Sequence, residues 1–294
     1  YAIDVAGSRI LTIANLKGGV GKTTTAANVA AYLAHDPAWQ KRVLLVDLDY
    51  QGTLSSMCLP DNDRWLPPPG LDSVATQAIS GVINPALFVS CAREIKQEPR
   101  LKVITAYYDL AQAENRMLIE WLLPLSDQSL VTRFLRLLRI RDADPTRSLK
   151  DVRYLLAEAL LDPQVQTGFD LIIIDAPPRL TTSHIQAMCA STHLLVPTIL
   201  DGLASDAIPR YLDQVATHKL GPNNDGSRAI CPHLQAIGVV CTMLPPGHAN
   251  LDGRLNELQR RIAAARLNPN IVPEECFIRQ RPPYRTHAGE RIAY

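Results

Sequence analysis

The segment Leu16-Lys17-Gly18-Gly19-Val20-Gly21-Lys22-Thr23-Thr24 follows an apolar run at residues 9–15 and precedes an alanine-rich helical pattern at residues 22–34. Its three glycines allow backbone conformations with φ > 0, so that successive N–H groups can close around a phosphate. A helix that begins near Lys22 adds the positive end of its dipole. The order of strand, glycine-rich loop and helix therefore predicts a phosphate-binding loop.

Two side chains of this loop are suited to a nucleotide and its metal ion. Lys22 can reach the β- and γ-phosphates, and the Thr23 hydroxyl can hold Mg²⁺. The strict pattern G-x-x-x-x-G-K-[ST] fails at one position, because Leu16 stands where the first glycine belongs. We expect ATP and Mg²⁺ as ligands, with the nucleotide bound by Lys17, Gly18, Gly19, Val20, Gly21, Lys22, Thr23 and Thr24.

Carboxylates end two further apolar runs. Asp47 and Asp49 close the run that begins at residue 43, and Asp175 closes the run that begins at residue 170. The carboxyl ends of parallel strands meet at the edge of the sheet where ligands bind. Mg²⁺ keeps several of its waters, which carboxylates can hold. We therefore expect Thr23, Asp47 and Asp175 to form the metal site.

Short apolar runs alternate with longer amphipathic stretches along the chain, which is typical of a mostly parallel sheet covered on both faces. We predict a single α/β domain over residues 1–294, with a twisted sheet and helices on both of its faces. The expected strands are residues 9–15, 42–48, 101–106, 170–175, 193–197, 236–242 and 276–278, and the expected helices are 22–34, 204–217 and 250–265.

Two stretches interrupt this alternation. Residues 59–70 contain four prolines and a glycine, which favour a loop. The interval 107–169 is longer than one crossover helix needs, and we expect two or three helices there, broken near Pro124 and residues 142–145. Its central part, residues 117–150, has the character of an insertion.

Composition restricts the class of protein. The net charge is +1 over 294 residues, so that any surface for nucleic acid must be a local patch. The six cysteines are widely spaced and several lie in apolar runs, which favours reduced thiols in a cytoplasmic protein. The longest apolar stretches have the length of strands, so that no membrane span is expected.

Three motifs resemble the ParA/MinD family of deviant Walker ATPases. The segment 17–24 is similar to the family's signature, and residues 171–178 (LIIIDAPP) are similar to its Walker B segment. Residues 44–52 (LLVDLDYQG) resemble the second motif of ParA-type partition ATPases, with Tyr50 where a proline is usual. The resemblance extends from about residue 9 to the end of the chain, apart from the insertion.

The resemblance implies roles for individual residues. Lys17 is similar to the lysine that reaches across a dimer to the partner's nucleotide, and Asp49 lies where the family orients the attacking water. The expected catalytic residues are thus Lys17, Lys22 and Asp49. Contacts to adenine are expected from the end of a late strand and from a following loop, at Thr242, Met243, Arg281 and Pro282.

Three functions remain open at this point. The first is a partition ATPase that dimerises with ATP, binds DNA non-specifically at the nucleoid and is activated by a ParB-like partner. The second is a MinD-like membrane-associated positioning ATPase, which needs a C-terminal amphipathic helix that the sequence does not show. The third is an electron donor similar to the nitrogenase iron protein, or a small-molecule ligase on the same fold; the positions of the cysteines do not match the iron protein.

Basic residues gather in two places. The expected DNA contacts are Lys219, Arg254, Arg260 and Arg261. Asp252 and Glu257 dilute this group, so that an ordinary solvated helix face is the alternative. Arginines also alternate with apolar residues at 133–141, which is compatible with packing on the domain or with contact to a partner.

Overall fold

The computed structural model describes residues 9–59, 67, 70–96, 98–122, 151–200, 202–244, 251–263, 267 and 270–271. Its centre is an eight-stranded sheet in the order β3-β4-β2-β5-β1-β6-β7-β8. All neighbouring strands are parallel except β3, which runs antiparallel to β4. The strands are β1 Ile10–Ile13, β2 Val43–Asp47, β3 Arg93–Ile95, β4 Glu98–Ile104, β5 Leu171–Asp175, β6 His193–Ile199, β7 Ala236–Thr242 and β8 Asn270–Ile271.

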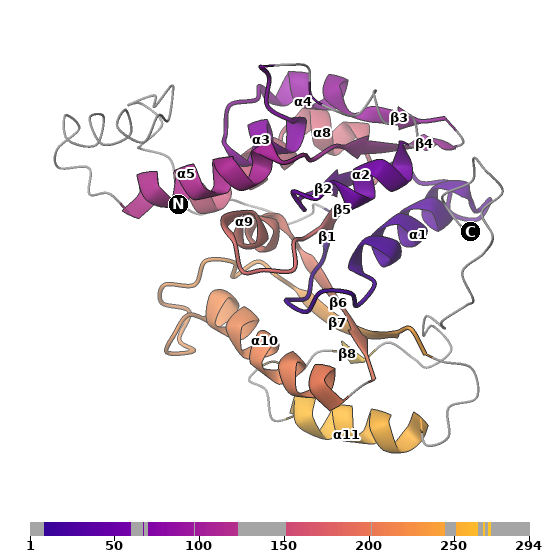
Figure 1. Ribbon diagram of the computed structural model, residues 1–294, viewed down its shortest axis with the longest axis vertical. Helices are drawn as coiled ribbons and strands as arrows, with labels where there is room; N and C mark the ends of the chain where they lie inside the picture. The colour runs from indigo at the N-terminus through magenta and orange to yellow at the C-terminus, as the bar shows by residue number, and fades with distance from the viewer. Residues whose placement is uncertain are drawn as a thin grey trace.

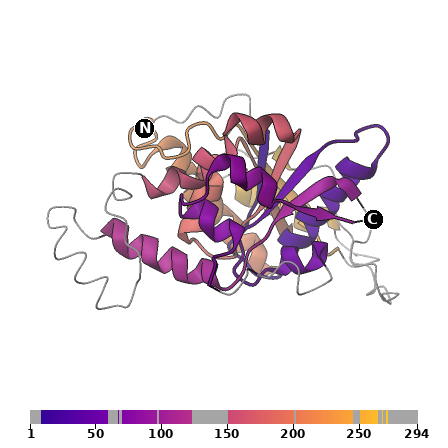
Figure 2. The ribbon, with the colours of Figure 1, turned by 90° about the horizontal axis from the view of Figure 1, so that it is seen from above.

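Helices cover both faces of the sheet (Figures 1 and 2). They are α1 Lys22–His35, α2 Thr53–Cys58, α3 Val74–Ile79, α4 Pro85–Cys91, α5 Asp109–Leu122, α7 Leu155–Leu160, α8 Pro163–Gly168, α9 Thr182–Ala190, α10 Gly202–Leu220 and α11 Leu251–Ala263, with a 3₁₀ turn at Val152–Tyr154.

The two cores follow from alternation along the strands. In β2, Val43 and Leu45 pack with the alanines of α1, whereas Leu44 and Val46 pack with the helices of the opposite face. All four side chains are fully buried. A parallel strand that is buried on both faces therefore appears in the sequence as a continuous apolar run.

The predicted fold class is confirmed. Six of the expected strands and all three expected helices are present, and the expected strand at 276–278 lies outside the described residues. The sequence did not reveal β3, which has three residues, or β8, which has two, because elements of this length carry no periodic pattern.

The interval 107–169 contains α5, α7 and α8 in its described parts, and α5 ends at Leu122, two residues before Pro124. Residues 123–150, with the arginines at 133–141, lie outside the described residues, as does most of the expected loop at 59–70.

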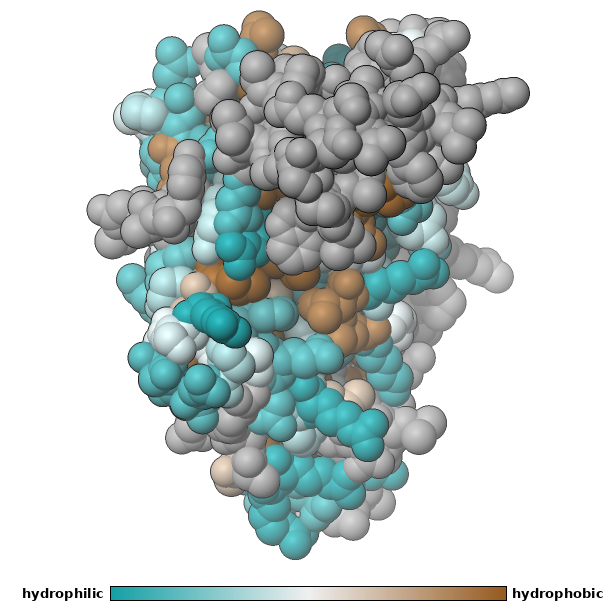
Figure 3. Space-filling model, turned by 90° about the vertical axis from the view of Figure 1, so that its left-hand side faces the viewer, coloured by the Kyte–Doolittle hydropathy of each residue, from teal (hydrophilic) through white to brown (hydrophobic). Residues whose placement is uncertain are grey.

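The surface and the cysteines agree with the composition. Among the described residues, no helix combines the length and the apolar character that crossing a bilayer requires. On the face at the left of Figure 1, hydrophilic residues predominate in the lower part, and hydrophobic residues are exposed near the centre (Figure 3). All five cysteines in the described part of the chain are free thiols, and four of them are buried.

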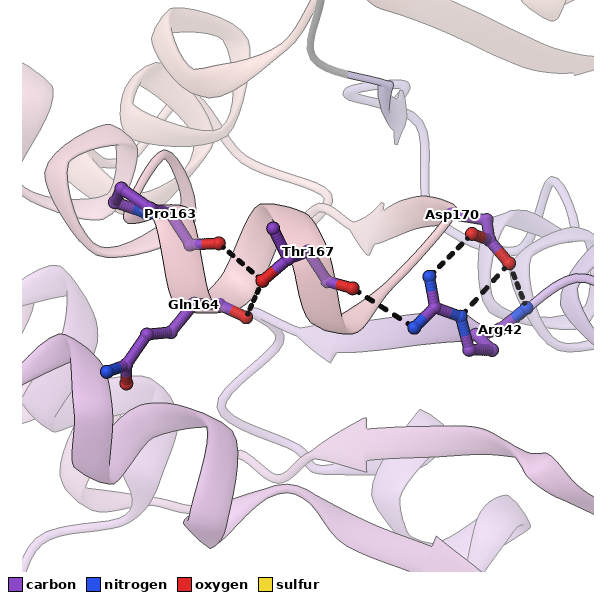
Figure 4. Close-up of polar contacts among 5 residues, drawn as sticks. All are labelled: Arg42, Pro163, Gln164, Thr167 and Asp170. Carbon is purple, nitrogen blue, oxygen red and sulfur yellow. Dashed lines mark hydrogen bonds and ion pairs between the residues drawn. The ribbon is translucent and has the colours of Figure 1, made fainter.

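An arginine joins two central strands at the amino edge of the sheet. The Arg42 guanidinium donates to both carboxylate oxygens of Asp170, with Nη2–Oδ1 at 2.8 Å and Nε–Oδ2 at 3.3 Å, and to the Thr167 carbonyl at 3.0 Å (Figure 4). The Arg42 backbone N–H donates to Asp170 as well, at 2.9 Å. These contacts fix the start of β2 against the start of β5, and they hold the pKa of Asp170 at about 2.

Asp170→Asn tests this contact. A carboxylate whose pKa is lower in the folded than in the unfolded state stabilises the fold above its unfolded pKa of about 3.9 and loses that contribution as the pH falls toward about 2. The pair is partly exposed, so that we expect a loss of about 0.5–1 kcal/mol at pH 7.

Urea unfolding should show this difference between parent and variant at pH 7, and the difference should shrink as the pH falls below about 4. Lys102→Met, which removes a cation paired with the exposed Glu94, serves as the control, with a smaller effect. An equal loss for D170N at every pH would show that the charge of Asp170 is not what stabilises this edge.

Candidate active site

The chain changes direction around β1. From β1 it crosses by α1 to β2, on the far side of β5, whereas from β5 it crosses by α9 to β6, on the opposite side of β1. In open α/β sheets, ligands bind at such a switch point, outside the carboxyl ends of the strands. The glycine-rich loop after β1 and the aspartates after β2 and β5 all lie at this edge.

The loop between β1 and α1 is held open by its own backbone. Gly19 and Gly21 have φ of 71° and 80°, a region that disfavours side chains, and Gly21 is the N-cap of α1. A Cβ added at Gly18 or Gly19 would meet no atom within 4 Å, so that there is open space above the loop. The backbone N–H groups can therefore surround an anion at the N-terminus of α1.

Two polar side chains fasten the loop to β6 and β7. Asn15, which is buried, donates from Nδ2 to the Pro197 carbonyl at 2.8 Å and accepts from the Lys17 N–H at 2.9 Å. Thr242 donates from its hydroxyl to the Val20 carbonyl at 2.8 Å, with the Thr198 carbonyl also in reach at 3.1 Å. The loop is thus fixed at both ends before any ligand binds.

The lysines of the loop have different environments. Lys22 is 7% exposed, and its Nζ donates to the carbonyl oxygen of Lys17 at 3.1 Å. Burial lowers the pKa of Lys22, while the nearby Asp175 and Asp49 act in the opposite direction. Lys17 is only partly buried, and the neighbouring Gly18 and Gly19 are exposed. The ammonium of Lys22 therefore lies inside the site, whereas Lys17 is partly exposed.

Asp47 and Asp175 are register partners on the adjacent strands β2 and β5, and both are fully or almost fully buried. Asp47 is satisfied within the protein: Oδ1 accepts from the Asp49 N–H at 3.0 Å, and Oδ2 accepts from the N–H and the hydroxyl of Ser55 at 2.9 and 2.7 Å. Burial raises the pKa of Asp47 to about 7, although the hydrogen bonds from Ser55 oppose this shift.

Asp175 is not satisfied. Among the residues that the structure describes, neither of its buried carboxylate oxygens has a hydrogen bond of good geometry, although the Thr23 hydroxyl is close enough to lower the pKa of Asp175 somewhat. Burial, and then the charge of Asp47, raise the pKa of Asp175 well above its usual range. A buried carboxylate without partners is expected to have a ligand, because the unpaired group is costly.

This arrangement fits a hydrated magnesium ion bound to a nucleotide. The described residues contain no group of three or more His, Cys, Asp or Glu side chains that could hold a metal alone. Mg²⁺ is commonly held by one or two protein groups together with water and substrate phosphates, and Thr23 and Asp175 supply such groups beside the loop. Asp47 faces the same edge, but its hydrogen bonds are used to hold Asp49 and Ser55.

Asp49 lies in a turn beside this pair. Its carbonyl accepts from the Gly52 N–H at 2.8 Å, and its Oδ1 accepts from the Gln51 N–H at 3.0 Å. The second bond orients the carboxylate, which is partly exposed. A carboxylate in this position can orient a water molecule.

The residues expected to contact adenine are only partly described. Met243 has φ of 55°, is 37% exposed, and has its Cε 3.7 Å from where a Cβ on Gly21 would lie. Thr242 and Met243 thus border the loop from the side of β7. Arg281 and Pro282 lie outside the described residues.

The basic residues expected to contact DNA do not form one group. Lys219 is near the end of α10, about 26 Å of helix away from its start at the carboxyl edge. Arg254 of α11 donates to the Leu200 carbonyl at 2.9 Å, at that carboxyl edge. Arg260 and Arg261 both pair with Glu257, at 2.7 and 2.6 Å.

Two residues that shape the site were not predicted. Asn15 and Ser55 each connect segments far apart in the sequence, and Ser55 also accepts from the Ala106 N–H at 3.1 Å. A polar residue at the end of an apolar strand, directly before the loop, was the only signal for Asn15. The sequence carries no comparable signal for Ser55.

Comparisons with known proteins find relatives along most of the chain. A family model described as an AAA domain matches residues 8–225. The chain is 30% identical to the chromosome partitioning protein ParA of Myxococcus xanthus, over 94% of this chain and 79% of the relative. It is also 30% identical to the chromosome-partitioning ATPase Soj of Thermus thermophilus, over 97% of this chain and 87% of the relative.

A solved structure shares the fold. Cobyrinic acid a,c-diamide synthase from Mycobacterium smegmatis, with bound ADP and magnesium, superimposes with a TM-score of 0.61 at 25% identity, over 86% of this chain and 82% of that one. The predicted ligands, ATP and Mg²⁺, are confirmed. The chain belongs to the ParA/MinD family of deviant Walker ATPases, to its ParA type, and is a magnesium-dependent ATPase.

Proposed function

We propose that this protein is a partition switch that forms a dimer with ATP, binds DNA non-specifically in that state, and hydrolyses ATP slowly to segregate or position DNA or another cargo. The observation that carries the proposal is the presence of two lysines in one loop. Lys22 is buried near Asp175, whereas Lys17 is partly exposed. The similarity to ParA and Soj supports the same reading.

The proposed role of each residue in the site follows from its environment. Lys22 and the loop N–H groups bind the phosphates, Thr23 and Asp175 hold the metal and its waters, and Asp47 keeps the strand end in place. The metal ion supplies charge that stabilises the transferring phosphoryl group. Asp49 orients the attacking water, and Thr242 and Met243 border the base.

Slow hydrolysis follows if one subunit lacks part of the site. Phosphoryl transfer depends mainly on positioning and on stabilisation of charge. Lys22 serves its own nucleotide, and Lys17 serves that of the partner subunit. Turnover then requires the dimer, and an activating partner similar to ParB raises the rate of hydrolysis by acting on that dimer.

The DNA contacts belong to α11 in this proposal. Glu257 pairs with both Arg260 and Arg261 and offsets one of their two positive charges, so that the helix of a single subunit is a weak anion site unless two copies act together. Arg254 lies on the same helix, whereas Lys219 lies apart from it, near the opposite edge of the sheet. The protein then associates with the nucleoid only in its ATP-bound state.

A small-molecule ligase is the second candidate, because the likeness to cobyrinic acid a,c-diamide synthase has a TM-score of 0.61. ATP turnover that rises with DNA favours the partition switch, whereas turnover that requires an added carboxylic acid and an amide donor favours the ligase. Pelleting with anionic liposomes in ATP would instead favour a MinD-like membrane switch.

Lys17→Ala and Asp49→Ala separate dimerisation from hydrolysis. K17A should bind ATP as a monomer and lose turnover, because its lysine no longer reaches the partner. D49A should bind ATP, form a long-lived dimer and lose turnover by about 100-fold, since the water is no longer oriented.

Light scattering in Mg·ATP and phosphate release measure the two properties, with Lys102→Ala, on β4, as the control. If K17A and D49A dimerise equally, the role of Lys17 across the dimer is wrong.

Arg260→Ala with Arg261→Ala tests the DNA surface. Neutralising phosphates releases counterions, so that the double variant should bind every duplex about tenfold more weakly and show a smaller salt slope. Glu257→Gln should strengthen binding, because it releases both arginines from their ion pair.

Fluorescence anisotropy with two unrelated duplexes in ATP and in ADP is the measurement. Arg93→Ala with Arg100→Ala removes two exposed arginines from β3 and β4 and should leave affinity unchanged. Equal DNA affinity for parent, double variant and E257Q would exclude α11 as the surface.

A further inference from the structure

The turn that carries Asp49 has a tyrosine at a position where proline is favoured. Asp49 to Gly52 form a four-residue turn closed by the Gly52 N–H on the Asp49 carbonyl at 2.8 Å, with Tyr50 second in the turn. Neither Tyr50 nor Gln51 has a positive φ, which is compatible with a type I turn. In such turns proline at the second position sets φ in advance, and tyrosine does not.

The Tyr50 ring is held by another segment instead. It lies 6.0 Å, between ring centroids, from Tyr108, which follows β4, with the ring planes at 51°. Tyr108 in turn meets Tyr107 edge to face, at 5.5 Å and 86°. These separations lie in the range in which aromatic pairs attract.

The segment that supplies Tyr108 is itself fixed. The Ala106 N–H donates to the Ser55 hydroxyl at 3.1 Å, and the Asp109 carboxylate accepts from the Ser73 N–H at 2.6 Å. Tyr108 is nevertheless 62% exposed, so that its ring is not needed to fill the core. A ring on a rigid segment, placed against a turn residue, restricts that turn.

We propose that the contact between Tyr50 and Tyr108 positions the turn of Asp49, and so orients the carboxylate for hydrolysis, in place of the restriction that proline would give. The inference rests on the proposed role of Asp49. Tyr50 and Tyr108 are positioning residues, since they act through Asp49 and not on the nucleotide. ATP binding depends on the phosphate loop and does not depend on this contact.

Single substitutions separate the ring from the hydroxyl. Tyr108→Ala should lower kcat about three- to tenfold, the factor that corresponds to the interaction energy of an aromatic pair. It should leave KM for ATP unchanged. Tyr108→Phe keeps the ring and should keep the parent's kcat. Tyr32→Ala, which removes a 57% exposed tyrosine of α1, is the matched control and should change neither value.

A double-mutant cycle with Tyr50→Pro gives the sharpest test. Proline at position 50 fixes φ without the aromatic contact, so that Y50P should retain at least half of the parent's kcat. Adding Tyr108→Ala to Y50P should then change kcat by less than about twofold. If Y108A lowers kcat equally in both backgrounds, or leaves the parent's kcat unchanged, the positioning role is overturned. Asp49→Ala distinguishes the two claims: full turnover in D49A contradicts the role of Asp49, whereas lost turnover in D49A with normal turnover in Y108A contradicts only the role of the tyrosines.

Discussion

Two buried carboxylates, side by side at the ends of β2 and β5, set the main physical constraint on this protein. Asp47 and Asp175 are register partners with no more than 1% exposure, and two like charges in such a place destabilise the fold unless something compensates them. Ser55 and the Asp49 N–H compensate Asp47, and the buried ammonium of Lys22 lies near Asp175. Both carboxylate oxygens of Asp175 lack a hydrogen-bond partner among the described residues. The site is therefore built for a cation and phosphates, at a cost that the ligand-free fold must bear.

Hydrogen bonds at both edges of the sheet hold the strands and the phosphate loop of this site in place. At the amino edge, Arg42 ties β2 to β5 through Asp170 and Thr167, so that the two strands that bear the carboxylates start in a fixed register. At the carboxyl edge, Asn15 and Thr242 tie the loop to β6 and β7. These contacts hold the loop in a conformation in which two glycines have positive φ and Lys22 donates to the loop's own backbone. Phosphoryl transfer requires a site that is preorganised in this way.

The features that could be predicted from the sequence are those that depend on a pattern of neighbouring residues. The loop with Lys22, the strand-end aspartates and the parallel sheet were all predicted from runs and spacings, because a buried parallel strand and a glycine-rich turn each leave a signature over a few residues. Contacts across long separations left none. Ser55 with Ala106 and Tyr50 with Tyr108 depend on the pairing of β4 with β2, and Thr242 with Val20 depends on how the end of β7 comes to lie beside the phosphate loop. The same limit explains why Lys219 and Arg254 looked like one basic group, although Lys219 lies at the far end of α10 and Arg254 of α11 lies at the carboxyl edge of the sheet.

The proposal that the buried carboxylate of Asp175 binds the magnesium of Mg·ATP is tested most directly by the thermal unfolding of Asp175→Asn with and without Mg·ATP. The amide removes a buried acid, so that the ligand-free variant should be at least as stable as the parent. Ligand at about 100 times its Kd should raise the Tm of the parent by roughly 4–5 °C and leave that of the variant unchanged. A variant that is much less stable without ligand, yet gains as much from Mg·ATP as the parent does, would contradict the account.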